Sequence, residues 1–282
     1  MYGLLCVDDI AIVGHSLFKN FRLALYNCFN KNSFKDVTSV DDLEDITHLI
    51  IVDEHHIPCA NIWRHDIVIN ELNRRNIKTI VLNFEKIYNS SFPWNTDNQL
   101  KLQTINNLTQ FVSDVNDAKI LNKQIVNKQF LSRDTVFDVK PQVEKNNRIL
   151  FIGQLNDYYP TRRQTIDDAR TSGLPVDIIV TDRRLCYSDF LQKLNEYTFI
   201  LNPLGTGNFL NIRFYEALKL GCIPLQQITQ DMISFYPELS NSINFINFNE
   251  ITLDTLTSHN ITATEYYLED FFKEINLAAY LQ

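Results

Sequence analysis

The chain has 282 residues, 45% of them hydrophobic and 21% charged, which is typical of an ordered protein with one large or two medium-sized cores. The formal net charge is −8, so no overall electrostatic attraction draws it to nucleic acid. The N-terminal stretch lacks a basic segment, and acidic residues interrupt its apolar run. We therefore expect no signal peptide, no membrane span and a cytosolic location.

Cysteine usage argues against a disulfide framework and against a zinc site. The five cysteines are odd in number and scattered, without a C-x-x-C pair, so we expect buried thiols. They are Cys6, Cys28, Cys59, Cys186 and Cys222. Residues 53–56, Asp-Glu-His-His, have the composition of a metal site, but neighbours on an extended strand point to opposite sides. We expect no structural metal.

Short apolar runs alternate with amphipathic stretches through the first half of the chain. In chain order they predict a strand in 3–7 or 10–14, a helix in 21–29, a strand in 48–53, a helix in 66–75 and a strand in 78–84. The runs at 49–52 and 79–82 are continuously apolar, as in strands buried on both faces of a parallel sheet. This rhythm predicts a doubly wound sheet.

The same rhythm restarts after a polar stretch at residues 129–147, where we place a domain boundary. Strands are predicted at 148–153, 176–180, 198–201 and 222–225, and helices at 162–171, 187–194 and 212–220. We expect two Rossmann-like α/β domains, residues 1–140 and 141–282. The helical pattern of residues 263–281 predicts a last helix that closes the second domain or crosses back to the first.

A glycine-containing loop followed by a helix is the strongest functional motif. After a predicted strand, Gly205 and Gly207 let backbone N–H groups approach a phosphate, and the helix offers its N-terminus to the same anion. Arg213 and Glu216, three residues apart, share one helical face. The arginine can balance a diphosphate and the carboxylate can accept ribose hydroxyls. The alternative is an exposed intrahelical ion pair.

The segment from Asn208 to Leu225 resembles the nucleotide-binding segment of GT-B glycosyltransferases. YEALKLGCIPL is similar to exostosin-type members, and NFLNIRFYE is similar to the donor loop of the T-even phage DNA β-glucosyltransferase family. The resemblance implies two domains facing a cleft, a UDP-sugar donor, and contacts from Arg213 and Glu216 to phosphate and ribose. Asn208 belongs to the same donor loop.

Two further charged pairs follow predicted strands of the second half. Arg162 and Arg163 can clamp a diphosphate with bidentate guanidinium groups, although a basic helix start on the surface is the alternative. The phage family also has two arginines in this loop, differently spaced. Asp182 and Arg183 fall where the GT-B resemblance implies contact with the nucleobase. Their alternative is a charged surface turn.

Glu85 is the first candidate for a general base, because it follows a buried strand at the edge where ligands bind. Its segment resembles the one that carries the catalytic aspartate of the phage family. Asp53 and Glu54 follow the preceding strand and are alternatives. His15, after Gly14, can orient the sugar or act as the base, and a structural role is its alternative.

These motifs together predict that the protein transfers the sugar of a UDP-sugar to an acceptor hydroxyl, with inversion at the anomeric carbon. The arginines and the helix N-terminus can neutralise the leaving diphosphate, so a divalent metal can assist but is not required. The phage resemblance implies 5-hydroxymethylcytosine in DNA as acceptor, whereas the acidic balance and the exostosin-like turn favour a glycan or glycoprotein. A non-catalytic nucleotide-sugar-binding module or an epimerase is the other class of answer. We expect a monomer.

Basic residues of the first half are candidates for a DNA-binding patch in this acidic protein. They are Arg64, Arg74, Arg75, Lys119, Lys123 and Lys128. Spacing along the chain alone leaves open whether they cluster.

Overall fold

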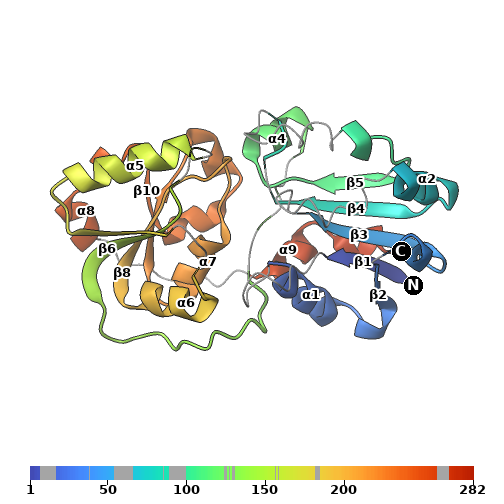
Figure 1. Ribbon diagram of the computed structural model, residues 1–282, viewed down its shortest axis with the longest axis horizontal. Helices are drawn as coiled ribbons and strands as arrows, with labels where there is room; N and C mark the ends of the chain where they lie inside the picture. The colour runs from blue at the N-terminus through green and yellow to red at the C-terminus, as the bar shows by residue number, and fades with distance from the viewer. Residues whose placement is uncertain are drawn as a thin grey trace. The chain divides into compact units, whose positions relative to one another are not determined.

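The computed structural model describes residues 1–6, 17–37, 39–53, 66–84, 86–88, 100–123, 126, 128, 131–155, 157, 159–181, 185–258 and 267–282. Within these ranges, the side chains of residues 3–6, 17–19, 53 and 160 are not described. Contacts divide the chain into two compact units. Unit 1 holds the described residues up to 135 and residues 267–282, and unit 2 holds the described residues from 136 to 258 (Figure 1).

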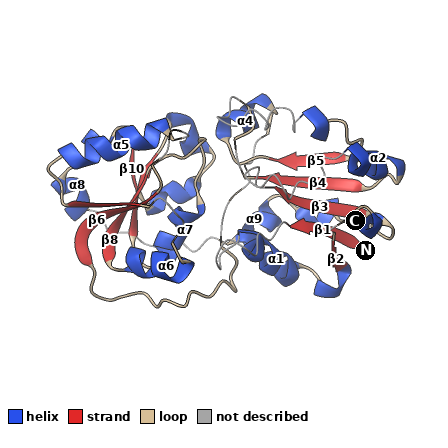
Figure 2. Ribbon diagram, viewed as in Figure 1, coloured by secondary structure: helices blue, strands red, loops and turns tan. Residues whose placement is uncertain are grey.

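Unit 1 contains a five-stranded, all-parallel sheet with the strand order β2-β1-β3-β4-β5. The strands are β1 (Tyr2–Cys6), β2 (Phe34–Asp36), β3 (His48–Asp53), β4 (Lys78–Asn83) and β5 (Leu108–Phe111). The helices are α1 (Leu17–Cys28), α2 (Asp66–Arg74), α4 (Val115–Ile120), α9 (Leu268–Glu274) and α10 (Leu277–Tyr280) (Figure 2).

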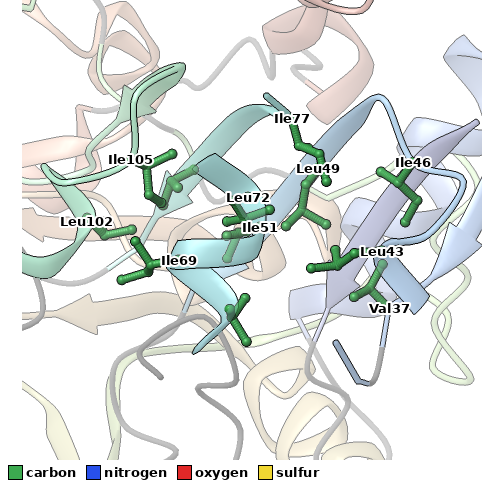
Figure 3. Close-up of a cluster of buried hydrophobic side chains, with 12 residues drawn as sticks. Val37, Leu43, Ile46, Leu49, Ile51, Ile69, Leu72, Ile77, Leu102 and Ile105 are labelled. Atoms are coloured by element: carbon green, nitrogen blue, oxygen red, sulfur yellow. The ribbon is translucent and has the colours of Figure 1, made fainter. Parts of the chain in front are cut away.

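Both faces of this sheet are covered, which explains why β3 and β4 are continuously apolar. On one face, Leu49, Ile51 and Val81 pack against Ile69 and Leu72 of α2 in one buried cluster (Figure 3). Phe21 of α1 contacts both Phe84, which follows β4, and Phe272 of α9, with ring centroids 4.8 and 5.7 Å apart. Because its aromatic rings join α1 and α9 to the end of β4, a C-terminal helix is part of the unit 1 core.

Unit 2 repeats the architecture with the strand order β10-β9-β8-β6-β7, again all parallel. Its strands are β6 (Asn146–Gly153), β7 (Val176–Val180), β8 (Tyr197–Asn202), β9 (Ile223–Gln227) and β10 (Ile243–Phe245). Its helices are α5 (Pro160–Thr171), α6 (Tyr187–Asn195), α7 (Ile212–Lys219) and α8 (Leu253–Thr257). Counted within each unit, both sheets have the order 2-1-3-4-5, which is a doubly wound, Rossmann-like order.

Alternate residues of β6 pack into two different hydrophobic clusters, one on each face of the unit 2 sheet. Ile149 and Phe151 pack in a cluster with Ile166 of α5. Leu150 and Ile152 pack in a second cluster with Leu191 of α6 and Ala217 of α7. The expected α/β class with parallel sheets is therefore confirmed.

The C-terminal residues return to unit 1 and are held there by polar contacts. The buried carboxylate of Glu269 on α9 accepts hydrogen bonds from Ser132 Oγ at 2.6 Å and Asn27 Nδ2 at 2.9 Å. Leu268 N donates to the carbonyl of Leu131 at 3.0 Å. The single helix expected over 263–281 is wrong: α9 and α10 are separated at Asn276, whose φ of 50° is left-handed.

Short elements escaped the sequence analysis, because β2, β5 and β10 have only three or four residues each and little periodicity. The expectation of buried thiols is wrong for Cys186, which is exposed. It occupies the N-cap position of α6, where the chain leaves a loop, whereas Cys222 is buried beneath α7. Cys28 is partly buried, and the side chains of Cys6 and Cys59 are not described.

Candidate functional site

The carboxyl edge of the unit 2 sheet has a switch point between β6 and β8. From β6 the chain runs through α5 to β7 on one side, and from β8 it runs through α7 to β9 on the other. In open parallel sheets, the loops that leave two such strands separate, and ligands bind in the crevice between them. The loops at residues 154–159 and 203–211 therefore border the candidate site.

Two glycines let arginine side chains lie directly against these strand ends. A Cβ added to Gly153, the last residue of β6, would lie 3.2 Å from Nη2 of Arg213. A Cβ added to Gly205, in the loop after β8, would lie 3.4 Å from Nη2 of Arg162. The loop glycine expected to admit a phosphate thus also makes room for a guanidinium group. In the same loop, Gly207 is buried and Asn208 is half-buried.

Arg213, in the first turn of α7, has buried donors without an acceptor among the described residues, and Glu216 on the same helix is its nearby counter-charge. Its Nε and Nη1 atoms are buried without a hydrogen-bond partner in the described part of the chain. The guanidinium carbon lies 6.0 Å from the centre of the Phe151 ring and 5.7 Å from that of Phe190. Burial, and then the charge of Arg162, lower the pKa of Arg213 to about 10. Buried donors without an acceptor are costly, so an anionic ligand would supply the missing acceptors here.

Arg162 and Arg163 have different environments, although they are adjacent in the first turn of α5. The guanidinium of Arg162 stacks 4.0 Å from the ring centre of Tyr159, and its Nη1 donates to the carbonyl of Gln154 at 3.2 Å. Arg163 is exposed and forms a 3.3 Å ion pair with the exposed Asp157. Of the two candidates, Arg162 is therefore the one directed toward the crevice and toward Arg213.

Two helices begin at this edge without a side-chain cap. Neither Tyr159 before α5 nor Asn211 before α7 makes a capping hydrogen bond. Asn211 instead donates through Nδ2 to Oδ1 of Asn202 at 3.1 Å. The positive end of a helix dipole favours anions. Beside Arg162 and Arg213, these two helix starts would suit a multiply charged oxyanion.

Glu216 lies one turn beyond Arg213 and is 2% exposed. Its Oε1 accepts a hydrogen bond from the Tyr187 hydroxyl at 2.8 Å. Burial raises the pKa of Glu216 to about 7, while the Tyr187 hydrogen bond and the charge of Arg213 oppose that rise. The pair expected from spacing is therefore not an exposed ion pair, and Glu216 is poised between its charged and neutral forms at neutral pH.

Buried amides at the ends of β8 and β9 anchor the glycine loop. Gln227 accepts hydrogen bonds through Oε1 from Leu204 N at 3.1 Å and from Thr165 Oγ1 at 3.0 Å. Asn202 donates through Nδ2 to Oε1 of Gln226 at 2.6 Å. Sequence analysis missed this network, and its only signal was two adjacent glutamines at the end of an apolar strand. The loop is thereby fixed at both ends.

The carboxyl edge of unit 1 carries a second polar network. Asn83, the last residue of β4, accepts a hydrogen bond from Gln110 Nε2 at 2.6 Å, and its carbonyl accepts one from Ser113 Oγ at 2.9 Å. The carboxylate of Asp117 on α4 accepts backbone N–H groups of Ile87 at 2.5 Å and of Tyr88 at 3.0 Å. These bonds hold the residues that follow β4.

Several predicted residues cannot be placed. Glu54, His15, Glu85, Asp182 and Arg183 lie outside the described residues. Asp53 ends β3, but its side chain is not described. The switch point of the unit 1 sheet lies between β1 and β3, so the end of β3 belongs to the edge where that unit would bind a ligand.

The described basic residues of the candidate patch lie at two edges of the unit 1 sheet. Arg74 and Arg75 both bond to Glu71 at the end of α2, next to the start of β4 and thus at the amino edge of the sheet. Lys119 lies on α4 beyond the carboxyl edge, and Lys123 follows that helix. Lys128 is buried, and Arg64 lies outside the described residues. The two arginines are therefore at the opposite edge of the sheet from Lys119.

A scan against models of protein families finds no match, and a search of the curated proteins finds no significant match. Within the described ranges, no helix is long and apolar enough to cross a membrane. The same ranges contain no group of three or more His, Cys, Asp or Glu residues that could hold a metal ion. The functional conclusion therefore depends on the geometry of the site and on the motif resemblance.

Proposed function

We propose that this protein is a glycosyltransferase of the GT-B kind that uses a nucleoside diphosphate sugar. The observation that carries the proposal is the pair Arg162 and Arg213, two guanidinium groups at a β6/β8 switch point. Two buried nitrogens of Arg213 lack a hydrogen-bond partner among the described residues. A diphosphate supplies oxygens for both guanidinium groups. The resemblance of the Asn208–Leu225 segment supports UDP as the nucleotide.

The donor lies with its diphosphate between the two arginines and the first turn of α7. Glu216, on the same face of α7 as Arg213, accepts the ribose hydroxyls when it is ionised. Asp182 and Arg183 remain the proposed contacts of the nucleobase. The arginines stabilise the negative charge that develops on the leaving diphosphate, so the reaction does not depend on a divalent metal.

The reaction is an inverting displacement at the anomeric carbon. A general base takes the proton of the acceptor hydroxyl as its oxygen attacks, and UDP leaves. Glu85 is the first candidate, and Asp53, Glu54 and His15 are the alternatives. The position of the β1/β3 switch point favours testing Asp53 beside Glu85. If Glu85→Gln retains the full kcat while Asp53→Asn loses it, the base is Asp53.

The two resemblances imply different acceptors. The phage family implies 5-hydroxymethylcytosine in DNA, and the exostosin-type turn implies a glycan or glycoprotein. The acidic balance of the chain, with a formal net charge of −8, favours the glycan.

One experiment tests both the activity and the acceptor. UDP release from UDP-sugars is measured with hydroxymethylated DNA at low salt and, separately, with an oligosaccharide panel. Release that depends on one acceptor establishes a transferase and its substrate class. Release with neither, despite tight UDP binding, supports a nucleotide-sugar-binding module instead, and conversion of the donor to another sugar nucleotide supports an epimerase.

A further inference from the structure

Helices α6 and α7 contact each other through two matched pairs of side chains. On α6, Tyr187 and Phe190 are three residues apart, and their rings stack with centroids 6.3 Å apart and planes 20° from parallel. On α7, Glu216 and Arg213 have the same spacing. The Tyr187 hydroxyl bonds to Glu216, and the Phe190 ring lies against Arg213. One turn of α6 therefore holds both donor-site side chains of α7.

The hydroxyl of Tyr187 stabilises the ionised form of a carboxyl group that burial would otherwise neutralise. Glu216 is almost fully buried, which raises its pKa, and the hydrogen bond from Tyr187 is the largest influence that lowers it. The charge of Arg213 is the next. A hydrogen bond to the charged form of an acid lowers its pKa and also fixes the orientation of its oxygens.

Several other charged or titratable groups lie on the described parts of these elements. Strands β8 and β9, which pack against α7, have the sequences YTFILN and IPLQQ and contain no charged residue. Lys193 of α6 pairs with Glu196, and Lys219 of α7 lies 5.3 Å from the ring centre of Phe137. Asp189 of α6 and Tyr197 of β8 lie on the same elements. Among the described residues, Tyr187 and then Arg213 lower the pKa of Glu216 against the effect of burial.

We propose that Tyr187 is a positioning residue for donor binding, which orients the Glu216 carboxylate and keeps it ionised for the ribose hydroxyls. This inference rests on the proposed function and deepens it, since Tyr187 itself touches neither sugar nor phosphate. If Tyr187 has this role, the affinity for UDP depends on pH, and it does so only when the nucleotide carries its ribose hydroxyls.

The test compares wild type with Tyr187→Phe and with Tyr2→Phe, a control that removes a tyrosine hydroxyl bond to Leu281 in unit 1. Dissociation constants of UDP and of 2′,3′-dideoxy-UDP are measured by calorimetry between pH 6 and pH 9. The titration of Glu216 is followed by carboxyl ¹³C NMR in the nucleotide-free protein.

In Tyr187→Phe we expect the Glu216 midpoint to rise by about one pH unit, and UDP to bind about fivefold more weakly at pH 7 but almost normally at pH 9. Dideoxy-UDP binding and the control should not change. Equal weakening for both nucleotides at every pH, or an unshifted Glu216 midpoint, would overturn the proposal. If wild type binds no UDP, the proposed function fails, and the NMR midpoint still decides whether Tyr187 controls the carboxyl group.

Discussion

Arg162 and Arg213 lie so close together that the positive charge of Arg162 lowers the pKa of Arg213. They come from different helices, and each packs against a glycine of the opposite strand or loop, Arg213 against Gly153 and Arg162 against Gly205. Two like charges gathered at a switch point weaken a fold unless a ligand neutralises them. The closeness of Arg162 and Arg213 is therefore more typical of an anion-binding site than of an ordinary charged surface.

Removing either Arg162 or Arg213 should weaken nucleotide binding selectively. We expect Arg162→Ala and Arg213→Ala to weaken UDP by at least tenfold, because each charge-assisted contact contributes about 1.5–3 kcal/mol. Arg163→Ala is the matched control, since Arg163 is exposed and pairs with the exposed Asp157. Calorimetry at fixed salt measures all three, and an equal loss in the control would reject the site.

Arg213→Met should bind no UDP and yet be more stable than wild type. The substitution removes buried donors that no described residue satisfies and keeps an unbranched apolar stem between Phe151 and Phe190. We expect a gain of about 1 kcal/mol in the free energy of unfolding without ligand, measured by urea denaturation. A clear loss of stability would mean that Arg213 is a structural residue.

Gly153→Ala should impair binding while Gly173→Ala impairs only stability. A Cβ at Gly153 presses on Arg213, whereas Gly173 has open space around it but a φ of 75°. We expect weaker UDP binding with a near-normal fold for the first. For the second, unchanged affinity should accompany a loss of about 1 kcal/mol in unfolding free energy. Measuring both quantities on both variants distinguishes close approach from backbone strain.

Asp117 should make the protein less stable as the pH rises through neutrality. Burial, and then the charge of Asp114, raise the pKa of Asp117 to about 7, above the ordinary value near 3.8 that it has when unfolded. The folded state therefore holds a proton between these values that the unfolded state releases. The stabilisation is complete below the unfolded pKa and is lost as the pH rises through about 7.

Urea unfolding at pH 5 and pH 8 measures this dependence. Asp117→Asn should flatten it, because the side chain no longer titrates. Glu216→Gln should remove a further part of the slope, since its pKa is raised in the same direction. An unchanged slope in Asp117→Asn would contradict a neutral Asp117 in the folded protein.

Glu269 should matter far more to stability than its neighbour Asp270. Glu269→Ala leaves Ser132, Asn27 and the Arg133 N–H without their buried acceptor, which should cost about 2–4 kcal/mol. Asp270→Ala removes partly exposed ion pairs with Arg133 and Lys273, each worth about 1 kcal/mol or less. Denaturant unfolding of the two variants gives the comparison, and equal losses would show that the buried acceptor is dispensable.

The α/β class and the order of the longer elements were predictable from sequence, because apolar periodicity follows directly from which faces are buried. The strand at Val176–Val180 and the helix start at Ile212 were predicted at their observed positions. The glycine-containing loop was also predicted from sequence, because glycine lets the backbone approach a ligand closely. Short strands and the break at Asn276 were not, because they depend on neighbours distant in the chain.

Which charged residues share a site depends on contacts between elements that are distant in the chain. Adjacent arginines look equivalent in sequence, but helix α5 turns Arg162 inward and Arg163 toward solvent. Tyr187 and Glu216 are 29 residues apart, and packing of α6 on α7 brings them within a hydrogen bond. Burial then raises the pKa of both groups, and the local sequence does not show that these polar side chains are buried. The spacing of residues predicts a candidate site, but desolvation and contacts between distant elements set the charge states of its side chains.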